Sequence, residues 1–192
     1  DRTGDLHSEA VYTANLAAAR REQGHLAEAV VPTERAIALL RGFGRPGELA
    51  LALLNAANLE LSLGDLDRAA QLASEARAVA ERAGDRRAAA LATNLAGDLA
   101  MRRGELGAAT AAYEAALATL STPADRLVVA ANLVDTAVAS GEEAAVRDAV
   151  ARLAALTPDS AVGRLRQARG VAAALLAGVA LDESQALAAR LA

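Results

Sequence analysis

The sequence contains no cysteine, tryptophan or lysine, and aromatic residues make up only 2% of its 192 positions. The absence of cysteine excludes disulfide bonds, zinc–thiolate sites and thiol nucleophiles. Few aromatic and β-branched residues argue against a β-sheet protein. Alanine and leucine, which are strong helix formers, instead occupy 55 and 30 positions. Because 54% of the residues are apolar, the chain is also unlike a disordered one. The composition therefore predicts an all-α globular fold.

The charge balance is mildly acidic, with 20 basic residues, all arginine, against 24 acidic ones. A protein that binds phosphate backbones needs a basic face, so we expect no direct contact with nucleic acid. The longest apolar run, Val171–Leu181, would span about 16 Å as a helix, against the ~30 Å of a bilayer core. We therefore expect no membrane contact and a cytoplasmic location. Residue 1 is Asp rather than Met, so we also expect native terminal residues to be missing.

Glycine recurs at strict 20-residue intervals, and the residues between these glycines show helical periodicity. The series consists of Gly4, Gly24, Gly44, Gly64, Gly84 and Gly104. Glycine ends helices readily because it adopts the left-handed conformation without steric cost. Acidic residues such as Asp65 and Asp85 follow the glycines and favour the start of another helix. The spacing therefore predicts a helix–turn–helix junction at each glycine.

Small residues show that the complete repeat is about 40 residues long and contains two helices. They recur at three helical positions: Ala17, Ala57 and Gly97; Ala29, Ala69 and Ala109; and Ala36, Ala76 and Ala116. Small side chains at fixed positions let two helix axes approach closely. The pattern predicts a stack of antiparallel helix pairs, that is, an α-solenoid.

These repeats resemble the tetratricopeptide repeat (TPR). The resemblance rests on Asn55-Ala56-Ala57, Leu63-Gly64-Asp65-Leu66 and Glu75-Ala76, and on the equivalent residues around Gly24 and Gly104. The repeat length is similar to that of the long variant found in multidomain bacterial regulators. The resemblance implies a right-handed superhelix forming a single array over residues 1–192, with repeats at 5–43, 45–83, 85–122, 124–157 and 160–192, the last two degenerate. A HEAT or armadillo array has a similar period and stays open as the alternative.

Several short motifs have structural interpretations. Gly42–Gly47 matches the dinucleotide-binding pattern GxGxxG but follows a helix rather than a strand, so we interpret it as a turn. Arginine pairs, at positions 20–21, 86–87 and 102–103, suit solvated helix ends, with an anion-binding edge as the alternative. Neither His7 nor His25 has an i,i+4 partner for a metal. We therefore expect no catalytic residue, metal or cofactor site, and no enzyme.

All asparagines of the chain lie in the first helix of a repeat, although asparagine is a mediocre helix former. In TPR arrays the first helices line a concave groove, and the resemblance implies that an asparagine there holds a bound peptide. The candidate groove residues are Asn15, Asn55, Asn58, Asn94, Asp98, Asn132 and Asp135. The alternative is that these side chains only bond neighbouring helices. The absence of lysine disfavours the lysine-based carboxylate clamp of some TPR proteins.

Two functional hypotheses follow from the sequence. The first is a scaffold that binds a protein or peptide in its groove. The second is a sensory or regulatory module of a larger transcriptional regulator, kinase or ATPase-linked signalling protein. The second draws on the C-terminal segment Asp182–Ala192, which lacks the polar capping helix that solenoids need and so suggests an excised fragment. Apolar surface at Val171–Leu181 could also support a homodimer.

Overall fold

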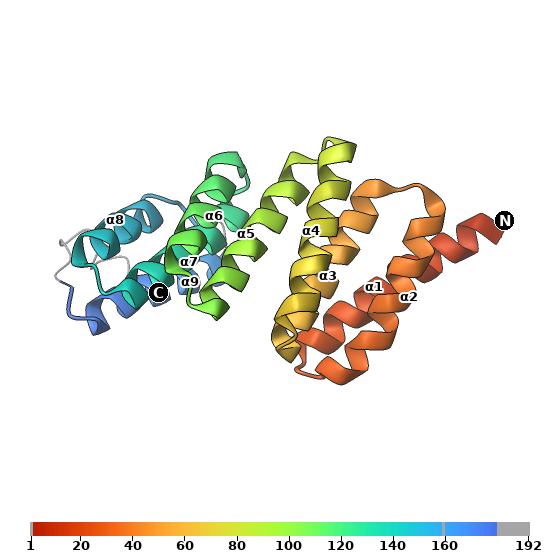
Figure 1. The fold of residues 1–192 in the computed structure, drawn as a ribbon, viewed down its shortest axis with the longest axis horizontal. Coiled ribbons are helices and arrows are strands. Elements are labelled where there is room, and N and C mark those ends of the chain that lie inside the picture. The colour runs from red at the N-terminus through yellow and green to blue at the C-terminus, as the bar shows by residue number, and fades with distance from the viewer. Residues whose placement is uncertain (1, 159, 180–192) are drawn as a thin grey trace. The chain divides into compact units, whose positions relative to one another are not determined.

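A computed structural model of the chain describes residues 2–158 and 160–179, and this part contains helices and no strand (Figure 1). The all-α prediction is confirmed. The helices are α1 (Arg2–Glu22), α2 (Leu26–Phe43), α3 (Pro46–Leu63), α4 (Leu66–Ala83), α5 (Arg86–Arg103), α6 (Leu106–Thr119), α7 (Pro123–Ser140), α8 (Glu143–Ala154) and α9 (Ala161–Leu176). The segment Asp182–Ala192 lies outside the described residues.

The chain divides into two compact units, Asp1–Leu99 and Ala100–Ala192, with the boundary inside α5. In the first unit, α1 packs against α2, α2 against α3 and α3 against α4. In the second unit, α7 packs against α6, α8 and α9. Successive helices therefore pack as antiparallel pairs within each unit, as the 40-residue pattern predicted. The single array over residues 1–192 stays a prediction.

Glycine ends most of the helices, as predicted. Seven described glycines adopt the left-handed conformation with φ between 63° and 90°: Gly24, Gly44, Gly64, Gly84, Gly104, Gly141 and Gly178. At one such turn, Gly64 N donates to Leu61 O and the following amide, Asp65 N, donates to Glu60 O at 3.0 Å. Gly44 is thus a helix end and Pro46 the first residue of α3, which confirms that the GxGxxG segment is a turn.

Gly4 is the exception to the predicted junctions. It lies inside α1, which begins at Arg2. No described helix precedes Gly4, so no chain reversal requires a left-handed residue there. The glycine spacing alone therefore overstates the number of junctions.

Side-chain length decides which acidic residue caps the next helix. Asp65 Oδ1 accepts the amide of Arg68 and Asp85 Oδ1 accepts the amide of Ala88, each at 2.9 Å. Glu105 and Glu142 stand at the equivalent helix starts of the second unit and make no such bond. The extra methylene of glutamate does not suit the geometry in which aspartate caps a helix.

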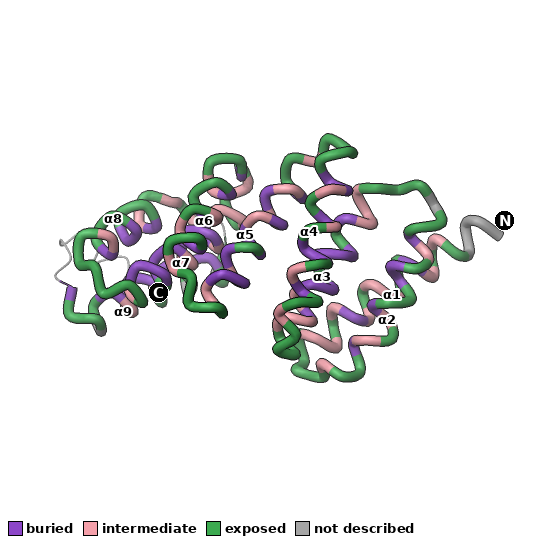
Figure 2. Tube along the Cα trace, viewed as in Figure 1, coloured by how far each residue is buried: buried purple, intermediate pink, exposed green. Residues whose placement is uncertain are grey.

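The recurring small residues lie where the helices of a pair touch. Ala29, Ala69 and Ala109 are fully buried, and Ala76 and Ala116 are buried to the same degree. Figure 2 shows buried positions recurring along each helix between exposed ones. The small side chains are thus buried, as their predicted role in close helix approach requires.

The degenerate fourth repeat packs larger residues at the same places. Val146 and Leu153 of α8 replace the alanines and are 1% and 0% exposed. Gly170 of α9 makes room for the second of them, because a Cβ atom added to Gly170 would lie 2.4 Å from Leu153 Cδ2. A larger residue on one helix is therefore matched by glycine on its neighbour.

The described part of the apolar run Val171–Leu181 is mostly covered within the second unit. Val171 and Ala174 are fully buried and Val179 is 6% exposed, whereas Leu175 is 44% exposed. Leu181 lies outside the described residues. Dimerisation through this end stays a prediction.

The glycine turns yield a first test. Gly64→Ala should lower the free energy of unfolding by about 1–2 kcal/mol, because an L side chain is strained in the left-handed conformation. The matched control is Gly107→Ala in α6. Nothing lies within 4 Å of a Cβ added at Gly107, and we expect stabilisation by about 0.5–1 kcal/mol. Urea unfolding followed by circular dichroism measures both values. Equal stability of Gly64→Ala and the wild type would contradict the role of the turn.

Candidate binding surfaces

Asn15 and Asn55 occupy equivalent positions, 40 residues apart, on the neighbouring helices α1 and α3. Both residues are exposed, and neither side chain has a polar partner among the described residues. Each amide therefore offers two N–H donors and a carbonyl acceptor to solvent. Of the candidate groove residues, these two are the ones most available to a ligand.

The other candidates in the first unit have intramolecular partners. Asn58 Nδ2 donates to Leu54 O of its own helix at 3.0 Å. Asn94 is only 9% exposed, and its Nδ2 donates to Asp98 Oδ2 at 3.4 Å. Asn94 and Asp98 also take part in further interactions. Their contacts favour a structural role over ligand binding.

In the second unit, Asn132 and Asp135 of α7 face α9 across a hollow of about 70 Å³. Arg166 and Arg169 of α9 line the same hollow. Both arginines are exposed, and neither forms a hydrogen bond or salt bridge with a described residue. Asn132 is half-buried and takes part in other interactions. The structure therefore brings an amide, a carboxylate and two guanidinium groups together.

The two arginines were missed in the sequence interpretation, although a signal was present. Arg169 follows Asn132 by 37 residues, which is also the spacing between Gly104 and Gly141. Arg169 therefore stands in α9 about where Asn132 stands in α7. A search for polar residues of any type at the asparagine position would have found it.

Asp135 has a raised pKa. The main cause is loss of water around its carboxyl group, which disfavours the charged form. The positive charge of Arg169 acts in the opposite direction and lowers the pKa in part. The charge of Arg169 thus offsets only part of the cost of removing water from the Asp135 carboxylate.

Both histidines and Arg20 have acidic partners within the first unit. His7 lies inside α1, and its Nε2 atom is 2.8 Å from Glu48 Oε2 of α3. Arg45 also donates to Glu48, and this hydrogen bond is the main reason why the Glu48 pKa is lowered; burial acts against it and His7 with it. Arg20 pairs with Glu28 at 3.2 Å.

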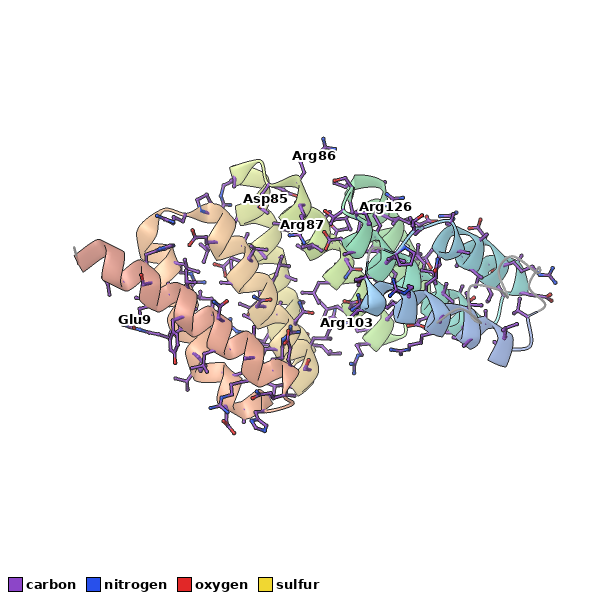
Figure 3. All side chains as sticks on the ribbon, turned by 180° about the vertical axis from the view of Figure 1, so that it is seen from behind. Glu9, Asp85, Arg86, Arg87, Arg103 and Arg126 are labelled. Carbon is purple, nitrogen blue, oxygen red and sulfur yellow. The ribbon has the colours of Figure 1, made fainter. Side chains whose placement is uncertain are left out.

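The remaining arginine pairs favour the interpretation as helix ends. Arg86 is exposed and points away from the ribbon at the start of α5 (Figure 3). Arg87 and Arg103 are exposed and take part in other interactions. These arginines do not line the hollow of Arg166 and Arg169, and an anion-binding edge at these pairs stays the alternative.

No helix in the described part of the chain combines the length and apolar character that a membrane crossing requires. Residues 2–158 and 160–179 also contain no group of three or more His, Asp or Glu side chains that could hold a metal ion.

Comparison with known proteins places the fold. No protein-family model matches the sequence, and the comparison with curated proteins gives no match. Solved structures do match. BtubC (BKLC) from P. vanneervenii has a TM-score of 0.75 at 16% identity, over 97% of this chain and 77% of its own. A kinesin-light-chain-like protein of Podosopora anserina with nearly identical TPR-like repeats has a TM-score of 0.67 at 16% identity, over 96% and 95%. A variant of that protein with a single substitution has a TM-score of 0.66 at 17% identity, over 100% and 98%. The chain has the TPR-like α-solenoid fold of these proteins.

The raised pKa of Asp135 predicts a pH dependence of stability. Since folding favours the protonated carboxyl, its stabilising contribution is present below the unfolded pKa and is lost as pH rises through the folded value. Asp135→Asn should therefore raise the melting temperature at pH 7 and leave it unchanged near pH 3. Arg169→Gln should have the opposite effect at pH 7, because it removes the charge that lowers the pKa. Thermal melts at both pH values test this; a lower melting temperature of Asp135→Asn at pH 7 would refute it.

Proposed function

We propose that this TPR-like repeat protein is a non-catalytic scaffold that binds a peptide segment of another protein along the exposed face of its first helices. The observation that carries the proposal is the repetition of Asn15 and Asn55 on the neighbouring helices α1 and α3. Both amides are exposed and have no polar partner in the described part of the first unit. A mid-helix asparagine lowers helix propensity, and here no intramolecular bond offsets that cost.

A peptide backbone suits these two amides chemically. An asparagine side chain can donate to a backbone carbonyl and accept from a backbone N–H at the same time. Such paired bonds recognise the main chain of an extended peptide irrespective of its side chains. Further exposed apolar side chains, Val11 and Leu51, lie one helical turn from the asparagines at equivalent positions of α1 and α3, and are each 42% exposed. They provide contact area for apolar peptide side chains.

The hollow in the second unit adds a preference for an acidic group. Arg166 and Arg169 carry two positive charges against the single carboxylate of Asp135. Arginine binds carboxylates in a bidentate manner and thus replaces lysine with a different geometry. We propose that the second unit binds a carboxylate here beside Asn132, either an acidic side chain or the C-terminus of a partner protein.

The proposal is tested with peptides selected from a phage-displayed library on the wild-type protein. The double variant Asn15→Ala/Asn55→Ala should weaken a selected peptide at least tenfold, because about 1 kcal/mol is lost with each hydrogen bond. Thermal stability should not fall, because neither side chain has a partner to lose. Calorimetric titration measures the affinity.

The matched control is Gln71→Ala, which removes an exposed amide from the second helix α4. Its affinity should equal that of the wild type. Selected peptides that bind the double variant as tightly as the wild type would show that the asparagine face is not the binding surface.

A further inference from the structure

The second unit contains a groove of about 530 Å³ between α6 and α8, with α7 as its floor. Both α6 and α8 pack against α7, and within the described residues they do not pack against each other. The groove lies on the side of α7 away from Asn132 and Asp135, because Leu133, Thr136 and Ala137 line it instead. It is therefore separate from the proposed peptide face.

The first unit has the same arrangement of helices but almost no groove. The equivalent space between α2 and α4 above α3 measures only about 20 Å³. The helices correspond closely: α3 runs from Pro46 to the residue before Gly64, and α7 runs from Pro123 to the residue before Gly141. The difference between the two spaces therefore comes from side chains rather than from helix order.

At several equivalent positions the side chain is larger in the first unit than in the second, whereas the reverse holds for Ala56, whose counterpart is Leu133. Val30, Leu59, Arg68 and Leu72 line the small space, and their counterparts in the groove are Thr110, Thr136, Ala145 and Ala149. Leu72 and Ala149 stand at equivalent positions of α4 and α8 and are 4% and 6% exposed. In the second unit, smaller side chains at these positions leave the space between α6 and α8 open.

The groove carries an excess of negative charge. Glu114, Glu142 and Asp148 line it, together with the single cation Arg152. Arg152 lies 3.2 Å from Glu114 Oε1 and 2.7 Å from Asp148 Oδ2. Glu142 has no ion pair or hydrogen bond from its carboxylate within the described residues. The lining therefore has a net charge of −2 around a floor of Leu133, Ala137 and Ala149.

We propose that this groove binds a basic amphipathic segment of a partner protein. An apolar side chain of the segment occupies the space left by Ala145 and Ala149 and rests on Leu133. Arginine or lysine side chains one helical turn away face Glu142 and the pair formed by Glu114 and Asp148. The charge of the lining excludes an acidic segment, which separates this partner from the one proposed for the asparagine face.

The experiment uses the full 192-residue chain and two fluorescein-labelled, alanine-based helical peptides. One carries leucines flanked by arginines at i+3 and i+4, and the other has glutamate in place of each arginine. The arginine peptide should bind, more weakly as salt is raised, and the glutamate peptide should not. Fluorescence anisotropy measures both. Failure of the arginine peptide to bind, or equal binding of the two peptides, would overturn the proposal.

Three variants locate the binding. Ala149→Leu restores the residue of the first unit, fills the groove and should weaken the arginine peptide at least tenfold. Gly107→Gln places a side chain in the groove where an added Cβ meets nothing within 4 Å, and it should have the same effect without harming the fold. Glu142→Gln should weaken binding about twofold to fivefold.

Glu105→Gln is the matched control, because Glu105 also begins a helix without a capping bond and does not line the groove. Its affinity should be unchanged. Full binding by both Ala149→Leu and Gly107→Gln would overturn the location. The variant Asn15→Ala/Asn55→Ala should bind the arginine peptide normally, so failure of the groove and failure of the asparagine face give different results.

Discussion

Short turns connect the helices, so each helix must end abruptly. The packing of both units depends on which groups hydrogen-bond the last carbonyl oxygens of each helix. The last carbonyl groups of a helix have no partner inside the helix. Left-handed glycines at the ends of α3, α4 and α7 turn the chain so that amides at the turn donate to some of these carbonyls. The helices α6 and α8 end without glycine. There, Arg126 donates to Leu117 O and Leu120 O at 2.9 Å each, and Gln167 donates to Leu153 O and Leu156 O at 3.0 and 2.9 Å. At these two ends, a long side chain of the next helix thus donates to the free carbonyl oxygens in place of backbone amides. These hydrogen bonds also connect the two helices.

Alanine recurs at the buried positions within the helix pairs of three repeats, while the groove-lining positions hold residues of different size and charge. Ala29, Ala69 and Ala109 are fully buried at the same place in three repeats. In the fourth repeat the larger Val146 takes this place and is 1% exposed, and Leu153 replaces the alanine of the second small position, where Gly170 makes room for it. At the equivalent groove-lining position, Leu72 in the first unit and Ala149 in the second are both buried and differ in size. Specific binding surfaces therefore arise on a constant framework by changes of side-chain size and charge.

The sequence predicted most of the fold because its decisive residues act locally. A glycine between two helical segments ends the first one through its own φ angle, whatever surrounds it. The junction predicted at Gly4 is wrong, because Gly4 lies inside α1 with helical residues on both sides of it. The asparagines were harder, since exposure depends on the direction of each side chain. Asn55 is exposed and Asn58, three residues later, bonds its own helix. Other features depend on residues from different helices, namely the caps made by Arg126 and Gln167 and the α6–α8 groove. Local sequence patterns do not predict such combinations.

Helix α7 separates two surfaces of opposite charge. Successive residues of a helix differ by about 100° in direction, so Asn132 and Asp135 face Arg166 and Arg169 while Leu133 and Thr136 face the acidic groove. The Thr136 hydroxyl donates to Asn132 O at 2.8 Å, which joins the two sides through the backbone of α7. The net charge of −4 for the chain therefore says little about which partner binds where. Screening limits the total charge to a weak long-range effect, whereas each surface presents its own charge at contact distance. One helix can thus select an acidic group on one side and a basic segment on the other.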